Sequence, residues 1–193
     1  VTQNNETDWE IAFECSDSGS NVILNSSIVC SAYNTYSTNF DSSYAIPSSG
    51  WKYDVTNGNL DSTAITIDSN NYVYIFNLGT SVSENIERGY KKIIIKKINS
   101  QQYQIRCADL SGENDTTVIL NKDSDFNFVA YSLTNSTVNN IFPFKNNWDL
   151  MFTAYTHMFN EYTPPLAYRV SGVIINRNNT LVAEDTTYNF NEI

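Results

Sequence analysis

Two kinds of metal-binding side chain occur close together near the C-terminal end of the sequence. His157 is followed directly by Met158, and Met151 stands six positions earlier. An imidazole nitrogen and a thioether sulfur both coordinate iron, so these three residues are candidate ligands of an iron site. His157 is the only histidine, so a second ligand would come from Met151, Met158 or a tyrosine. Because His157 and Met158 are adjacent, we do not expect them to reach opposite faces of one iron.

The histidine lies in a segment rich in aromatic side chains, residues 155–165. Tyr155, Phe159 and Tyr162 in this segment are the candidate contacts of a bound ligand. The segment is additional relative to a similar, earlier part of the chain, and inserted loops often carry binding residues. We therefore expect a loop over 155–165 that forms a binding site. The other interpretation is a surface loop in which His157 has no ligand role.

A five-residue motif that occurs twice defines an internal duplication. Trp9-Glu10-Ile11-Ala12-Phe13 is followed, 13 positions after its Trp, by Val22-Ile23-Leu24-Asn25; Trp148-Asp149-Leu150-Met151-Phe152 is followed, 25 positions after its Trp, by Val173-Ile174-Ile175-Asn176. Both copies contain Trp, an acid, an aliphatic residue, a variable residue and Phe, and then a branched strand that ends in Asn. A repeat shapes the whole fold, so we expect copies near 1–60 and 126–193 within a single domain, 1–193.

The elements that position these residues are expected to be strands. The chain has 13 Tyr and 10 Phe, and residues that favour long helices are scarce,. Short apolar or alternating runs between turn signals such as Asn57-Gly58 indicate many short strands. They lie at 9–14, 21–30, 51–55, 64–67, 72–76, 91–98, 103–107, 117–120, 125–133 and 168–176, with mostly loop at 31–50. The fold class is therefore all-β, an antiparallel sandwich or meander of many short strands.

Within the first Trp motif, period-two alternation places Trp9 on the same sheet face as Ile11 and Phe13. We therefore expect both tryptophans of the repeat to pack in the core. Glu10 would point to the other side, where its carboxylate can accept a hydrogen bond from a backbone amide.

The three cysteines, Cys15, Cys30 and Cys107, do not form a disulfide framework, because their number is odd,. Cys15 and Cys30 flank the first repeat strand and would pair if a hairpin brought them together. The simpler interpretation is three small buried thiols. No pair has the spacing of a zinc finger, so no metal site is expected from them.

Composition excludes several function classes. The formal net charge of −10 disfavours nucleic acid, because binding requires a basic surface that displaces counterions from phosphates,. No stretch approaches the ~20 apolar residues of a spanning helix, so the chain is not expected to span a membrane. No nucleophile-elbow serine or phosphate-binding glycine loop is present, and only one imidazole base is available. We expect that the protein is not an enzyme.

The two copies of the repeat differ at their ends. A predicted strand over 125–138 leads into the second Trp motif, whereas only residues 1–8 precede the first. Conversely, the segment Gly50-Trp51-Lys52 of the first copy has no counterpart after the second. This pattern favours a fragment of a longer polypeptide, and divergence of the repeat ends is the alternative.

Several segments together resemble the HmuY family of Bacteroidetes surface lipoproteins. The resemblance extends over most of the chain, through residues 5–13, 22–25, 50–52, 59–65, 90–93, 147–156 and 170–176. Its most distinctive part is the Trp-acid-aliphatic-x-Phe motif with the downstream strand ending in Asn, because it is present twice.

The resemblance implies a haem-binding protein without chemistry of its own. Members of the family act as hemophores at the outer-membrane surface, lipid-anchored or released to the extracellular space. They take haem from the medium or from a host haem carrier and pass it to an outer-membrane haem transporter. They hold the iron between two axial side chains, two His in the founding type and Met in others. The axial candidates that this implies here are His157, Met158 and Met151.

Two functions of different classes follow. The first is haem capture, which predicts a Soret band on addition of hemin and a change in that band when His157 is replaced by Ala. The second is a surface interaction or glycan-binding module of the same fold that does not bind haem. Its tyrosines would supply stacking platforms for sugars.

Overall fold

The computed structural model describes residues 3–176 and 178–184, which form short strands and two single-turn 3-10 helices. The helices are η1 (Ser26–Ile28) and η2 (Leu60–Ser62). The strands are β1 (Ile11–Glu14), β2 (Val22–Leu24), β3 (Ser31–Asn34), β4 (Tyr74–Asn77), β5 (Thr80–Ser81), β6 (Ile86–Glu87), β7 (Tyr90–Asn99), β8 (Gln102–Ala108), β9 (Thr116–Asn121), β10 (Phe128–Ser132), β11 (Thr137–Asn139), β12 (Leu150–Phe159) and β13 (Leu166–Ile175).

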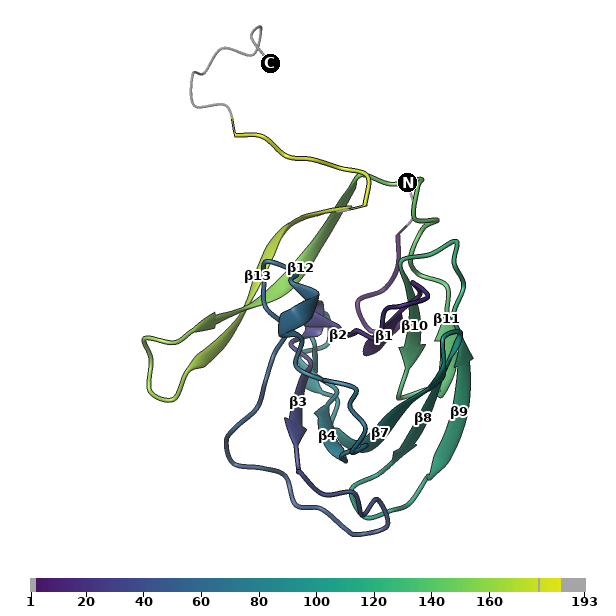
Figure 1. The fold of residues 1–193 in the computed structure, drawn as a ribbon. Helices are drawn as coiled ribbons and strands as arrows, with labels where there is room; N and C mark the ends of the chain where they lie inside the picture. The colour runs from purple at the N-terminus through teal and green to yellow at the C-terminus, as the bar shows by residue number, and fades with distance from the viewer. Residues whose placement is uncertain (1–2, 177, 185–193) are drawn as a thin grey trace, which may run out of the picture.

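Two antiparallel sheets pack face to face and enclose the core (Figure 1). One has the order β11-β10-β1-β2 and the other β3-β4-β7-β8-β9. Their inner faces meet through large side chains that are fully buried, among them Phe13 of β1, Phe76 of β4 and Tyr103 of β8. The Tyr103 hydroxyl donates a hydrogen bond to the Glu14 carbonyl at 2.9 Å, so its polar atom is satisfied within the core,. The predicted all-β antiparallel fold is confirmed.

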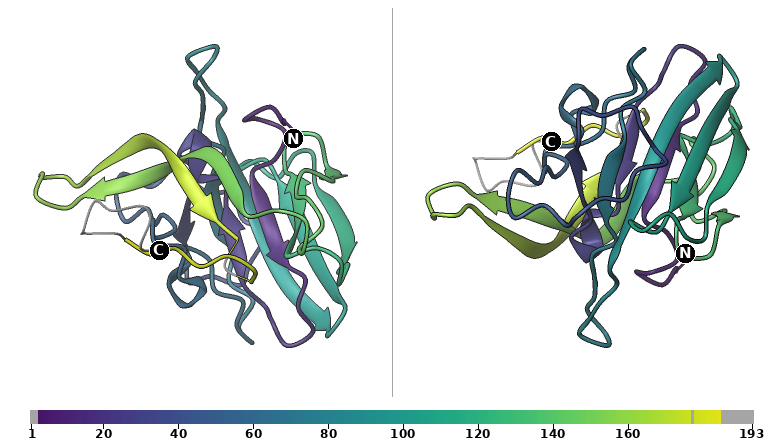
Figure 2. Two further views of the ribbon diagram at one scale, coloured as in Figure 1. Left: turned by 90° about the horizontal axis from the view of Figure 1, so that it is seen from above. Right: turned by 90° about the horizontal axis from the view of Figure 1, so that it is seen from below.

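The β12–β13 hairpin is a separate two-stranded sheet that projects from the sandwich (Figure 2). Its strands pair continuously from Leu150 opposite Ile175 to Phe159 opposite Leu166. The expectation of an inserted loop over 155–165 was therefore wrong for residues 155–159, and only residues 160–165 form the turn. The cause is composition: residues 155–159 are aromatic, β-branched or Met, and such side chains favour paired strands.

One asparagine side chain joins the two ends of the first repeat copy by hydrogen bonds. Asn25 Nδ2 donates to the backbone carbonyls of Glu6 and Trp9, both at 2.8 Å. Its Oδ1 accepts a hydrogen bond from the Ser27 amide at 3.1 Å. We call this arrangement the asparagine clasp. It holds the segment that precedes β1 next to the end of β2.

The second copy has the same clasp at the matching positions. Asn176 Nδ2 donates to the carbonyls of Lys145 at 2.7 Å and Trp148 at 2.9 Å, and its Oδ1 accepts from the Asn178 amide at 3.3 Å. The backbone amide of Asn176 donates to the Asp149 carbonyl, as that of Asn25 does to the Glu10 carbonyl. The two Trp motifs therefore fold alike locally, as expected of a duplication.

Several sequence expectations about strands differ from the structure. Residues 21–30, expected to be one strand, form the short strand β2 and then the helix η1. Residues 31–34, expected to be loop, form β3, because pairing with β4 supplies the hydrogen bonds that their mixed sequence does not predict. Lys52 is the only residue of 51–55 that pairs, through an isolated bridge to Ala32. Residues 64–67 form no strand, although Ala64 and Ile65 are buried in the core. The apolar side chains of this segment are explained by their burial, although its backbone does not pair with another strand.

Two further features concern the thiols and the membrane. Cys15, Cys30 and Cys107 are all free and buried, so the simpler interpretation of three buried thiols is the one observed. In the described part of the chain, no helix has the length and apolar character needed to cross a membrane.

Candidate functional site

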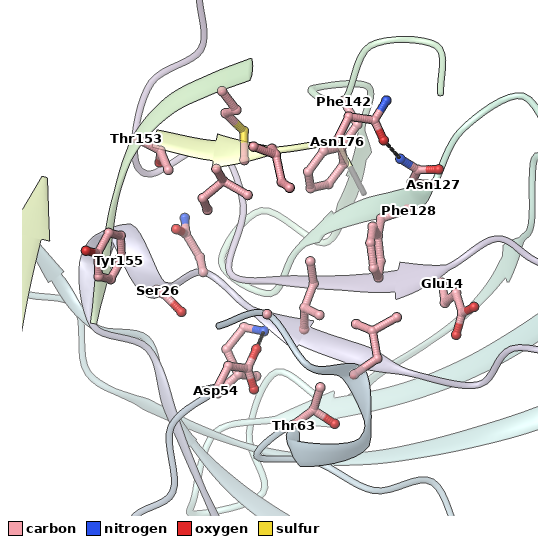
Figure 3. A pocket seen from close by; sticks show the side chains of 18 of the residues that line it. Glu14, Ser26, Asp54, Thr63, Asn127, Phe128, Phe142, Thr153, Tyr155 and Asn176 are labelled. Atoms are coloured by element: carbon pink, nitrogen blue, oxygen red, sulfur yellow. Dashed lines mark hydrogen bonds between the residues drawn. The ribbon is translucent and has the colours of Figure 1, made fainter. Parts of the chain in front are cut away.

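A cleft of about 820 Å³ lies where the β12–β13 hairpin meets the sandwich. Its walls come from the hairpin, the outer face of β1, β2 and β10, the loop 54–63 and the segment 142–148. Figure 3 shows Thr153 and Tyr155 on the hairpin side, with Phe128 and Phe142 on another wall and Asp54 contributed by the loop. The volume is within the range of pockets that hold small molecules and cofactors.

One part of the cleft is lined by aromatic rings. Trp9, Phe126, Phe128, Phe142 and Trp148 all contribute. Phe142 packs edge-on against Trp9 at 5.5 Å between ring centroids, and it packs in a tilted arrangement against Phe128 at 5.9 Å. The expectation that both tryptophans are core residues was wrong: β1 begins at Ile11 and β12 at Leu150, so strand alternation does not extend back to either tryptophan.

The hairpin wall is held in place by two hydrogen bonds to η1. Thr156 Oγ1 donates to the Ser26 carbonyl at 2.8 Å, and Arg169 Nε donates to the Ser27 carbonyl at 2.7 Å. Thr156 is buried, so this contact is shielded from water,. The middle of the hairpin is therefore fixed to the first repeat copy, and its free end projects beyond it.

Tyr155 and Met151 extend from β12 into the cleft lining. A glycine on the neighbouring strand makes room for the tyrosine ring, because a Cβ at Gly172 would lie 2.6 Å from Tyr155 Cε1. Two of the candidate ligand residues, the thioether of Met151 and the ring of Tyr155, are thus brought together in one concave site.

The other candidate residues lie toward the tip of the hairpin, outside the cleft lining. His157 packs edge-on against Phe159 at 4.7 Å, and Phe159 packs against Tyr162 at 6.1 Å. Met158 follows His157 on the opposite face of β12, as strand alternation requires. His157, Phe159 and Tyr162 therefore form an aromatic cluster at the tip, separate from Met151 and Tyr155.

The acidic and thiol groups of the cleft serve the fold. Glu14 accepts hydrogen bonds from the Asn21 amide at 3.2 Å and side chain at 2.7 Å. Burial raises the pKa of the Cys15 thiol, which keeps it protonated and weakly nucleophilic,. Among residues 3–176 and 178–184, no group of three or more His, Cys, Asp or Glu side chains is placed to hold a metal ion.

Asp54 attaches the loop 54–63, which lines part of the cleft, to the rest of the fold. Its carboxylate accepts hydrogen bonds from the Leu24 amide at 2.6 Å and the Ala64 amide at 2.8 Å. Burial raises the pKa of Asp54 from 3.8 to about 6, and the two amide hydrogen bonds oppose the rise. The loop is thus attached to β2 by a carboxyl group that is partly desolvated.

Asp54 should make stability depend on pH. Because its pKa is higher in the folded chain, the folded state binds more protons than the unfolded state between about pH 4 and pH 6. Its contribution to the free energy of unfolding therefore falls as pH rises through that window. Relative to Asp54→Asn, wild type should gain about 2 kcal/mol between pH 7 and pH 4, somewhat less than the full shift because the residue is partly exposed. Urea unfolding of both chains at pH 4, 5, 6 and 7 measures this, and a pH-independent difference would contradict it.

Comparisons with protein-family models, with curated proteins and with solved structures found no match. The resemblance to the HmuY family therefore stays a prediction.

Sequence reasoning did not identify the aromatic wall, which supplies much of the cleft's apolar surface. One signal was available, because Phe142-Pro143-Phe144 places two aromatic rings around a proline just before the second Trp motif. Phe142 and Pro143 line the cleft, and Phe144 stacks on Phe126 at 4.9 Å. The relation of Phe142 to Trp9 depends on a contact between residues far apart in the chain, which periodicity does not reveal.

Proposed function

We propose that the cleft binds haem without transforming it, and that the protein is a hemophore-like carrier. The observation that carries the proposal is a cleft of about 820 Å³ whose lining contains both aromatic rings and the thioether of Met151. A porphyrin is flat and largely apolar, and stacks on aromatic side chains. A thioether is a known axial donor to haem iron.

Met151 replaces His157 as the preferred ligand in this proposal. The two residues are six positions apart on one strand, which corresponds to about 20 Å at the usual rise. They cannot both reach one iron from the cleft. Met151 lines the cleft and His157 does not. Tyr155, four positions from Met151, is placed to contact the porphyrin ring or its edge.

Charge gives the proposed haem an orientation. Lys145 is the cationic side chain among the described residues of the lining, and its backbone carbonyl shares the Asn176 side-chain amide with that of Trp148. Haem carries two propionates, and a cation can pair with one of them. The propionates are therefore expected at the end of the cleft near Lys145.

A hemin titration tests the proposal. Wild type should develop a Soret band, and Met151→Ala should weaken hemin binding at least tenfold and shift the band. Met151→His should restore tight binding with the spectrum of an imidazole ligand. His157→Ala and Met158→Ala are matched controls at the tip and should bind as wild type does. A wild-type band that depends on His157 and not on Met151 would overturn the ligand assignment.

A glycan is the second candidate ligand. It is favoured by the amide and hydroxyl groups that share the lining with the aromatic rings, including Asn57, Asn59, Asn127 and Asn178. Such groups hydrogen-bond sugar hydroxyls while a ring stacks on the sugar face. Binding of a neutral polysaccharide, with no Soret band, would favour this candidate over haem.

The cellular role that goes with the first candidate is haem capture outside the cell or at the outer-membrane surface. The protein would take haem from the medium or a host carrier and transfer it to an outer-membrane transporter. Transfer of haem from loaded protein to apo-myoglobin, followed by absorbance, would measure how readily the cleft releases its ligand.

A further inference from the structure

The β12–β13 hairpin has an exposed apolar face whose counterpart is buried in the first repeat copy. In the first copy that face consists of Ile11, Phe13, Val22 and Leu24, of which none is more than 3% exposed. The matching positions in the second copy are Leu150, Phe152, Val173 and Ile175. Phe152 is 80% exposed, Leu150 51% and Val173 49%, whereas Ile175 is half-buried. Val173 and Ile175 also belong to the lining of the cleft, so the exposed face adjoins it. Both faces have the composition Ile, Leu, Phe and Val, so they fit the same kind of covering layer.

One edge of the hairpin is also open. In the first copy, β10 pairs antiparallel with β1, with Ile11 opposite Tyr131 and Glu14 opposite Phe128. Within the described residues, β12 pairs only with β13. The far edge of β13 is unpaired too, but its counterpart β2 is itself an edge strand. The comparison therefore identifies β12 as the edge that accepts a strand.

The acidic residue of the Trp motif indicates the charge of a layer that would cover the second hairpin. Glu10 is fully buried and paired with Arg88, which belongs to the segment that covers the first hairpin. Asp149 occupies the equivalent position in the second copy and is exposed. A layer that covers the second hairpin as residues 26–139 cover the first would bring a basic side chain to Asp149.

We propose that the β12–β13 hairpin is a docking surface for a second sheet unit of the kind formed by residues 26–139. The occupant covers Leu150, Phe152, Val173 and Ile175 with an apolar sheet, adds an antiparallel strand along β12, and pairs a cation with Asp149. It must lack a hairpin of its own. An intact second copy of this chain does not qualify, because its covering sheet already packs on its own β1 and β2.

The test places the second hairpin under the covering layer within the full chain, where Trp9–Asn25 is replaced by a second copy of Trp148–Asn176. We expect this chimera to unfold cooperatively in urea, because residues 26–139 then cover the grafted hairpin as they cover the first one. Phe152→Asp made in the graft alone should abolish the cooperative transition. The same substitution in the hairpin of the wild-type chain, where Phe152 is 80% exposed, is the matched control and should leave unfolding unchanged.

Cooperative unfolding of the chimera, and its loss when Phe152→Asp is made in the graft, support the proposal. The proposal is overturned if both chimeras lose cooperative unfolding, because the layer then does not fit the second hairpin. It is overturned equally if both keep cooperative unfolding, because the layer then does not cover Phe152.

Discussion

Phe13→Ala should lower the free energy of unfolding by about 3–5 kcal/mol, whereas Phe152→Ala should change it by less than about 0.5 kcal/mol. The two phenylalanines hold the same position in the two repeat copies. Phe13 is fully buried between the two sheets and packs on Tyr103 at 5.1 Å, so its loss leaves a cavity. Phe152 is 80% exposed and leaves none.

Urea unfolding followed by tryptophan fluorescence and circular dichroism measures both variants. Phe13→Leu is the matched control, because it keeps most of the buried volume and should be less damaging than Phe13→Ala. Equal losses at Phe13 and Phe152 would mean that the second hairpin face is covered in solution. That result would contradict the exposure of Phe152 in the structure of the single chain.

Arg88→Ala should destabilise the fold by about 3–5 kcal/mol, because it leaves a buried carboxylate without its cation. Glu10 Oε2 accepts the Leu133 amide at 2.6 Å and its Oε1 accepts Thr134 Oγ1 at 3.0 Å, while Arg88 pairs with the same group. The hydrogen bond from Leu133 confirms the expectation that the strand acid accepts a backbone amide.

Chemical unfolding of three variants separates charge from packing. Arg88→Ala combined with Glu10→Leu should be no less stable than Arg88→Ala alone, because the second change removes the unpaired charge. Asp149→Ala is the control at the equivalent exposed position and should be within about 0.5 kcal/mol of wild type. A double variant that is less stable than Arg88→Ala alone would contradict the prediction that the unpaired carboxylate of Glu10 is the main cost.

Local sequence signals predicted much of the fold. Residues 91–98 and 103–107 were expected to be strands, and they lie within β7 and β8, which pair with each other. The repeated Trp motif predicted two copies of one local structure, and the clasps at Asn25 and Asn176 have the same pattern of bonds. These features depend on residues close in sequence or on strong apolar alternation, so a local sequence pattern is enough to predict them.

What the sequence did not predict depends on distant contacts. The strand β3 forms because β4 lies beside it, 40 or more positions later. The cleft joins Met151 of the hairpin to Trp9, Phe128 and the loop around Asp54, which come together only in three dimensions. His157 drew attention because it is the single histidine, yet pairing of β12 with β13 places it toward the tip of the hairpin. The residue types identified plausible iron ligands, but only the folded arrangement of the strands shows which of them lie in the same site.

The asparagine clasp has a consequence for how the two hairpins assemble. Asn25 holds a hairpin inside a core, and Asn176 holds one that is largely open to water, with the same pattern of bonds. The shape of the second hairpin is therefore set by hydrogen bonds within its own repeat copy, without a covering layer. A partner that meets the second hairpin encounters a rigid template and avoids most of the entropic cost of ordering it. Encounter should then proceed at a rate limited by diffusion and orientation, without a preceding folding step.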